Sequence, residues 1–179
     1  MSVDPIETKN LRLISHSPQD IVALIEGVDF YTQSFGWPPA NGLRDFYGSK
    51  DVSPQWLAQL RAASVADVWT HGFGVVHVAS RQVIGAGGFK GRPGEDGAVE
   101  IAYGIVPDYQ GRGYATEVAA ALVEFALKSG QVRVARAHTL AEKNASTRVL
   151  AKCGFSFLGE VVDPEDGPVW RWEKVLQAV

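Results

Sequence analysis

The chain has 179 residues, of which 46% are hydrophobic and 21% are charged. This length suits one domain over residues 1–179, and the composition excludes disorder, collagen and coiled coil for the chain as a whole. The net charge of −3 has the wrong sign for a protein that binds mainly nucleic acid. Cys153 is the sole cysteine, so no internal disulfide calls for an oxidising compartment. No apolar run is long enough for a membrane span, and residues 1–9 lack a signal-peptide core. We therefore expect a cytoplasmic protein.

The first half of the chain predicts strands mixed with short helices. In chain order we expect a strand over 10–15, a helix over 19–26, turns and short helix over the aromatic-rich stretch 29–47, a helix opening at Ser53-Pro54, and strands over 72–80 and 83–90. Pro18 favours the start of the first helix. The last two strands suggest an antiparallel hairpin, although Arg81-Gln82 is poor chemistry for a two-residue turn and the true loop could be longer.

The second half alternates strands and helices more regularly. We expect a strand over 98–106, a helix over 113–129, a strand over 132–140, a helix over 144–152, and strands over 155–162 and 169–175. The helix over 113–129 is apolar nearly all round, so the sheet should bury it. The strand–helix–strand order around it implies a parallel pair, whereas the rest of the sheet should be antiparallel. The fold class is therefore α+β, with a mixed, mostly antiparallel sheet of about six or seven strands flanked by helices.

One glycine-containing loop carries the strongest chemical signal. Residues 107–116 read P-D-Y-Q-G-R-G-Y-A-T and join the strand over 98–106 to the buried helix. The glycines permit a sharp turn, the helix start presents unpaired N–H groups, and Arg112 adds a positive charge, which together suit a phosphate or pyrophosphate. A nucleoside-triphosphate loop would need a lysine after Gly113, and a dinucleotide loop would need a glycine at Thr116, so both alternatives are disfavoured.

Gln110–Ala115, Q-G-R-G-Y-A, resembles the Q/R-x-x-G-x-G/A loop with which the GNAT N-acetyltransferases bind acyl-coenzyme A. Residues 100–107 and 144–155 are similar to neighbouring segments of that family, and residues 6–13 resemble the first strand of its RimJ/RimL-like branch. The resemblance implies the GNAT fold, in which the parallel strands splay apart to admit acetyl-CoA, together with transfer of acetyl directly to a primary amine. The acceptor could be a protein N-terminus or a small amine.

The same resemblance implies the coenzyme-binding residues. They would be Ile105, Val106, Gln110, Gly111, Arg112, Gly113, Tyr114, Ala115, Thr116 and Asn144. The first two lie beside the pantetheine arm and the loop residues meet the pyrophosphate. The family asparagine falls at Lys143, so the contact from Asn144 is displaced by one position. A plain helix cap with a glycine turn is the competing explanation of the loop.

Catalytic roles follow from the resemblance in the same way. Glu100 is the candidate base for the acceptor amine, and an ordinary solvent-exposed glutamate at a strand end is the alternative. Leu150 stands where many relatives carry an acidic tyrosine, so Ser146 is the fallback proton donor, with a helix cap as its alternative role. His138 is either a catalyst or a satisfied sheet residue.

The acceptor side is less well defined by the sequence. By the resemblance, Phe30–Trp37 and the acidic turn Asp163–Pro168 would line it, although the turn also reads as a solvated hairpin. Trp37 and its neighbours are either core or a contact between two copies, which leaves a homodimer open. No spacing of histidine and cysteine suggests a metal. Because Leu150 removes a proton donor, a catalytically silent acyl-coenzyme-A-binding module is the second functional hypothesis.

Overall fold

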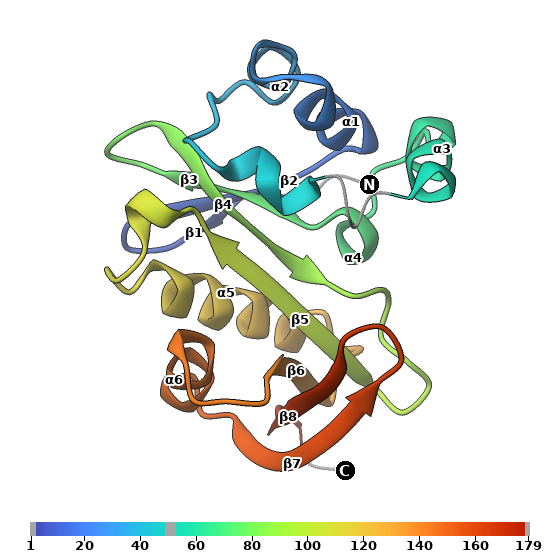
Figure 1. Cartoon of the computed structure of the whole chain (residues 1–179), viewed down its shortest axis with the longest axis vertical. Helices are drawn as coiled ribbons and strands as arrows, with labels where there is room; N and C mark the ends of the chain where they lie inside the picture. The colour runs from blue at the N-terminus through green and yellow to red at the C-terminus, as the bar shows by residue number, and fades with distance from the viewer. Residues whose placement is uncertain (1–2, 49–52, 178–179) are drawn as a thin grey trace.

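A computed structural model describes residues 3–48 and 53–177. It contains an eight-stranded sheet in the order β1-β2-β3-β4-β5-β6-β8-β7 (Figure 1). The strands are β1 (Ile6–Glu7), β2 (Leu11–Ser15), β3 (Phe73–His77), β4 (Gln82–Phe89), β5 (Ala98–Ile105), β6 (Val134–Leu140), β7 (Ser156–Asp163) and β8 (Gly167–Val175). β5 and β6 are parallel, and the other neighbouring strands are antiparallel. The predicted α+β class is confirmed, and the two-residue β1 accounts for the strand beyond the expected seven.

The helices lie on both sides of the sheet. They are α1 (Pro18–Glu26), α2 (Val28–Phe35), α3 (Pro54–Ala62), α4 (Val68–His71), α5 (Tyr114–Lys128) and α6 (Ala145–Lys152), with 3₁₀ turns η1 (Leu43–Tyr47) and η2 (Pro107–Tyr109). Figure 1 shows α1 and α2 on one side of β2–β4 and α5 on the other. The glycines of the sheet agree, because a Cβ at Gly74 would meet Phe35 of α2, whereas one at Gly87 would meet Val118 of α5.

Local sequence explains where the main helices begin. Ser17 and Asp20 form a capping box at α1, and Ser53 caps α3 ahead of Pro54. α5 has no side-chain cap, because it begins at Gly113, whose φ is 84°. Its apolar residues are nevertheless well buried, with Val118, Ala119, Leu122 and Ala126 fully covered. Packing against the sheet, rather than capping, therefore stabilises this helix.

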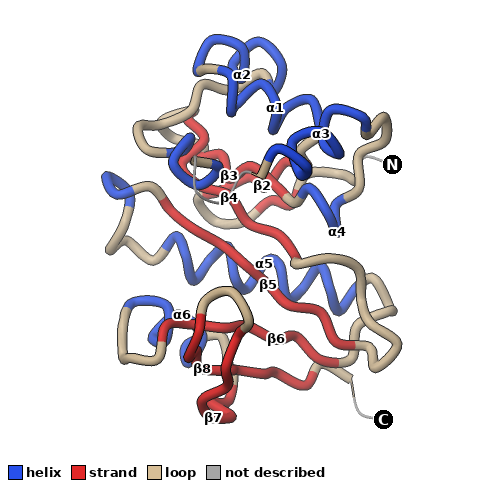
Figure 2. Tube along the Cα trace, turned by 45° about the vertical axis from the view of Figure 1, so that its right-hand side comes forward, coloured by secondary structure: helices blue, strands red, loops and turns tan. Residues whose placement is uncertain are grey.

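The parallel strands separate after a short paired stretch. Pairing between β5 and β6 joins residues 98–100 to residues 134–136, although β5 continues to Ile105 and β6 to Leu140. Figure 2 shows the two strands diverging toward α6. Backbone groups on the inner edges of the diverging segments lack a strand partner, so a ligand can bind between them.

Most local details of the first half follow the sequence-based expectations. The hairpin loop spans residues 78–81, with Arg81 left-handed at φ 58°, so the longer loop is the alternative that is confirmed. The stretch 29–47 forms short helix and turn, in α2 and η1, as predicted. The short helix α4, capped by the Asp67 side chain, was not predicted.

Candidate active site

Two cavities meet where β5 leaves β6. The loop cavity, of about 490 Å³, lies between the end of β5, residues 109–111 and 113–116, and the first turns of α6. The sheet cavity, of about 540 Å³, lies between β4, β5, η1, α3 and α4. Phe46, Tyr103 and Gly104 line both cavities. A group held in one cavity can therefore reach a group held in the other at this junction.

The predicted loop and the first turn of α5 present free backbone donors on one stretch of the chain. Within the described residues, no acceptor is recorded for the N–H groups of residues 111 to 116, and the first bond of the helix start is from Glu117 to Gly113. Gly111 and Gly113 have φ of 76° and 84°, the left-handed region that favours glycine. Consecutive N–H groups at the start of a 15-residue helix attract an anion through their dipoles. The N–H groups of residues 114 to 116 are open as at any uncapped helix start, and the glycine turn adds the N–H groups of Gly111 and Gly113 to them.

Side chains on both flanks hold the loop in place. Gln110 Nε2 donates to the Ile105 carbonyl at 2.9 Å, and the Tyr109 hydroxyl donates to Gln82 Oε1 at 3.1 Å. The Tyr114 hydroxyl lies 3.0 Å from His77 Nε2, to which it is hydrogen-bonded. These contacts join the loop to β3, β4 and β5, so its N–H groups are fixed before any ligand arrives.

Positive charge gathers around the same cavity. The Arg112 guanidinium lies 5.4 Å from the centre of the Tyr109 ring and donates to the Asp108 carbonyl at 3.2 Å. Arg148 and Lys152 of α6 also line the cavity, and neither has an ion-pair partner in the described part of the chain. The sequence signal for these two cations is their spacing of four residues, which places them on one helix face.

Of the remaining predicted binding residues, some line the loop cavity and others do not. Ile105 and Thr116 line the loop cavity, whereas Val106 does not. The Val106 N–H is bonded to Ile84 and its carbonyl to Tyr109, so both polar groups are already occupied. Asn144 is the N-cap of α6, where its side chain accepts from the Thr147 N–H, and it is not among the lining residues.

Glu100 lies in a charged cluster on the sheet face that bears the sheet cavity. Its Oε1 is 3.1 Å from Lys90 Nζ and 2.8 Å from His138 Nδ1, and its side chain is 21% exposed. His138 Nε2 accepts from Arg171 at 3.3 Å, so both ring nitrogens are engaged and His138 is a satisfied sheet residue. Partial burial and two partners exclude the solvent-exposed alternative for Glu100. Ala102, the next residue on the same strand face, lines the sheet cavity.

Ser146 and Tyr103 face each other across the loop cavity. The two side chains share a hydrogen bond, and burial raises the pKa of Tyr103 to about 12. Ser146 is the second residue of α6 and lines the cavity, while Asn144 caps the helix, so the capping role considered for Ser146 is wrong. Leu150 is fully buried in the core and offers no proton donor. Tyr103 was not predicted, because strand alternation groups it with core residues such as Ile101.

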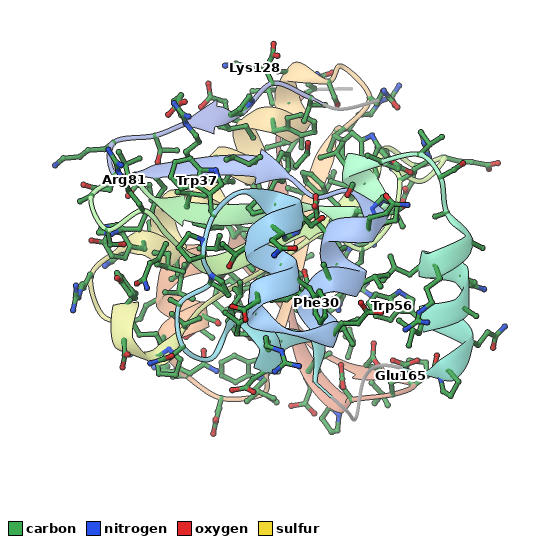
Figure 3. All side chains as sticks on the ribbon, turned by 90° about the horizontal axis from the view of Figure 1, so that it is seen from above. Phe30, Trp37, Trp56, Arg81, Lys128 and Glu165 are labelled. Atoms are coloured by element: carbon green, nitrogen blue, oxygen red, sulfur yellow. The ribbon has the colours of Figure 1, made fainter. Side chains whose placement is uncertain are left out.

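The walls of the sheet cavity come from segments without a local motif. They include Asp45, Phe46 and Tyr47 of η1, Trp56 of α3, Thr70 and His71 of α4, and Gly87 to Phe89 of β4. Figure 3 shows Trp56 on the side of α3 that faces α1. The expected segments Phe30–Trp37 and Asp163–Pro168 do not line this cavity. In the acidic turn, Asp163 Oδ1 accepts from the N–H groups of Glu165 and Asp166. These bonds belong to a hairpin turn, the alternative to an acceptor-binding role for this segment.

Two polar side chains, Asp45 and His71, determine which chemical groups the sheet cavity can bind. The Asp45 carboxylate is exposed, with no ion pair recorded among the described residues. His71 Nδ1 accepts from the Asp67 N–H at 3.1 Å, which leaves the proton of a neutral ring on Nε2. Burial lowers the pKa of His71, so the neutral donor form is favoured. The cavity thus offers one anion, one N–H donor and aromatic walls.

Neither a metal cluster nor a membrane helix is found in the described part of the chain. Residues 3–48 and 53–177 contain no convergence of three or more His, Cys, Asp or Glu side chains that could hold a metal ion. In the same ranges, no helix has both the length and the apolar character to cross a bilayer.

Comparison with known proteins identifies the family. The family model described as an acetyltransferase (GNAT) domain matches residues 10–156. The uncharacterized N-acetyltransferase YjdG of Bacillus subtilis (strain 168) is 26% identical over 125 residues, which is 70% of each protein. RimL, a ribosomal L7/L12 alpha-N-protein acetyltransferase solved with coenzyme A, is 15% identical with a TM-score of 0.67, covering 97% of this chain and 98% of RimL. The ribosomal-protein-S5-alanine acetyltransferase of Vibrio fischeri is 17% identical, with a TM-score of 0.65 and 97% of each chain covered.

These ribosomal-protein acetyltransferases share the fold of the chain almost from end to end, as the resemblance to the RimJ/RimL-like branch predicts. The family match covers most of the 179 residues and includes the glycine loop, β5 and α6. The chain therefore belongs to the GNAT acetyltransferase family.

Proposed function

We propose that the chain is an acetyl-CoA-dependent N-acetyltransferase that transfers acetyl directly to a primary amine. The observation that carries this proposal is the glycine turn and helix start at residues 111 to 116, whose open N–H groups lie beside a cavity lined by Arg148 and Lys152, two cations without an ion-pair partner among the described residues. An acyl-coenzyme A has a pyrophosphate for the loop, a further phosphate for Arg148 and Lys152, and an amide-rich arm for the gap between β5 and β6. The residues present therefore fit this co-substrate.

The gap between the strands supplies partners for the amide-rich arm. In an antiparallel ladder the polar groups of successive residues face opposite edges. Because the Val106 N–H is bonded to Ile84 of β4, the N–H of Ile105 and both polar groups of Tyr103 face the gap. The Ile105 carbonyl is bonded to Gln110. We therefore assign the arm to Tyr103 and Ile105 rather than to Val106. Bound there, the co-substrate supplies an activated acetyl group as its thioester.

Glu100 is the proposed base for the acceptor amine. Its ion pair with Lys90 and its hydrogen bond with His138 both use Oε1, so Oε2 is left to bind a water. Ala102 on the same strand face lies about 7 Å along β5 and lines the sheet cavity, a distance that two hydrogen-bonded waters can span. The waters remove a proton from the amine and pass it to Glu100, while Lys90 and His138 hold the carboxylate in place.

The sheet cavity is the proposed acceptor site. The exposed Asp45 carboxylate at its wall attracts a protonated amine, and the His71 N–H can donate to an oxygen of the acceptor. Phe46 and Trp56 provide apolar contact for the remainder of the molecule. An N-terminal residue of a protein and a small polar amine both have this combination of groups. RimL, a structural neighbour, is named for an acceptor of the first kind.

Thiol release from acetyl-CoA across a panel of peptides and small amines tests the proposal. We expect release that depends on the acceptor, together with a higher melting temperature in coenzyme A but not in ATP or NAD. Binding of coenzyme A without acceptor-dependent release would favour the silent acyl-coenzyme-A-binding module. No binding of coenzyme A at millimolar concentration would refute both functions.

A further inference from the structure

Three phenol side chains line the loop cavity, and two of them are fully engaged elsewhere. The Tyr109 hydroxyl donates to Gln82, and the Tyr114 hydroxyl is hydrogen-bonded to His77. The Tyr103 hydroxyl is hydrogen-bonded to Ser146, whose own hydroxyl can donate as well as accept. Apart from Ser146, no acceptor is recorded in the described residues for the proton of Tyr103. Tyr103 is therefore the cavity phenol whose O–H can bind a ligand.

Tyr103 lies at the point where the loop cavity and the sheet cavity meet. Tyr103 lines both cavities, at the junction through which an acetyl group must pass from one to the other. The sulfur of the thioester must lie at the same junction for the acceptor amine to reach the acetyl carbon. On the α6 side, Leu150 is buried and has no polar group. The phenol side chain at this junction is therefore Tyr103 of β5, on the wall of the loop cavity opposite α6.

We propose that the Tyr103 hydroxyl donates a hydrogen bond to the coenzyme sulfur as the acetyl group leaves it, with Ser146 positioning the phenol. This inference rests on the proposed function. During transfer a C–N bond forms to the acetyl carbon, the C–S bond breaks, and its electron pair stays on sulfur. The protonated amine loses one proton toward Glu100 before it attacks and a second to solvent as the amide forms, and the thiolate later takes one proton from solvent. The phenol keeps its own proton throughout, since burial raises its pKa to about 12. Its contribution is stabilisation of the developing charge.

The direct test is the titration of the coenzyme thiol while it is bound. Coenzyme A is held at saturating protein, and the ultraviolet absorbance of its thiolate is followed with pH. A hydrogen bond to the thiolate favours the charged form, so Tyr103→Phe should raise the pKa of the bound thiol by about one unit. Tyr31→Phe removes a phenol hydroxyl that lines neither cavity and should leave that pKa at the wild-type value. Ser146→Ala should raise the pKa by less than Tyr103→Phe.

Turnover gives a second readout. With acetyl-CoA, Tyr103→Phe should lower kcat about 10- to 100-fold with an unchanged coenzyme Kd. With the selenium analogue of acetyl-CoA, whose selenol is a much better leaving group, the loss should shrink toward wild-type turnover. If the bound thiol titrates identically in wild type and Tyr103→Phe, or if Ser146→Ala alone shifts it, the inference is wrong while the proposed function stands. If wild-type protein binds no coenzyme A, the proposed function itself fails.

Discussion

Gly113→Ala tests whether the backbone shape of the loop is built for the coenzyme. Gly113 has φ 84° and ψ 4°, and Gly36 at the end of α2 has φ 89° and ψ 0°. A Cβ at either position would meet no atom within 4 Å, so neither substitution causes a clash. A side chain in the left-handed region costs about 1–2 kcal/mol. Gly36→Ala should therefore lower the free energy of unfolding by about this amount, whereas Gly113→Ala should lower it by less, because the free loop can relax.

The two variants should differ in coenzyme affinity. The loop can relieve the strain at Gly113→Ala only by turning its N–H groups away from the phosphate position, so binding restores the full cost of about 1–2 kcal/mol. That cost corresponds to a coenzyme A Kd raised about 5- to 30-fold. Gly36 lines neither cavity, and its variant should bind coenzyme A as the wild type does. Chemical denaturation measures the first quantity and titration calorimetry the second. Equal Kd values for Gly113→Ala and wild type, or equal weakening by Gly36→Ala, would refute the reasoning.

Two further predictions concern ionisable side chains. Glu100→Gln should lower kcat about 100-fold at neutral pH and leave the coenzyme Kd unchanged, since Glu100 lines neither cavity; unaltered turnover would remove it from the mechanism. Burial lowers the pKa of His16 from 6.5 to about 4, so its neutral form stabilises the fold fully above pH 6.5. That stability, at most about 3 kcal/mol, is lost as the pH falls through 4. Denaturation of His16→Gln should lack this dependence between pH 6.5 and 4, and an identical slope in the variant would contradict the assignment.

The coenzyme side of the site could be predicted because its determinants are local. Gly111 and Gly113 must adopt left-handed φ values, and the start of α5 follows directly from the same loop. A short motif therefore fixes both the backbone shape and the free N–H groups. Ser146, predicted as the fallback proton donor, lines the loop cavity, because α6 begins where the capping residue Asn144 allows. Its role in the reaction remains a prediction.

The acceptor side could not be predicted, because its residues converge only in the folded chain. Asp45, Trp56 and His71 come from three separate short elements without a recognisable pattern. Tyr103 shares a strand face with Ile101, so alternation alone assigns it to the core. It becomes accessible because β5 and β6 stop pairing after Glu100, and that separation depends on packing across the sheet.

The central claim is that the amides at the start of α5 hold the pyrophosphate of coenzyme A. A crystal structure of the complex measures this directly. We predict phosphate oxygens within hydrogen-bonding distance of the N–H groups of residues 111 to 116, with the thiol at Tyr103. Coenzyme A bound with its pyrophosphate elsewhere, and those N–H groups facing solvent, would contradict the account.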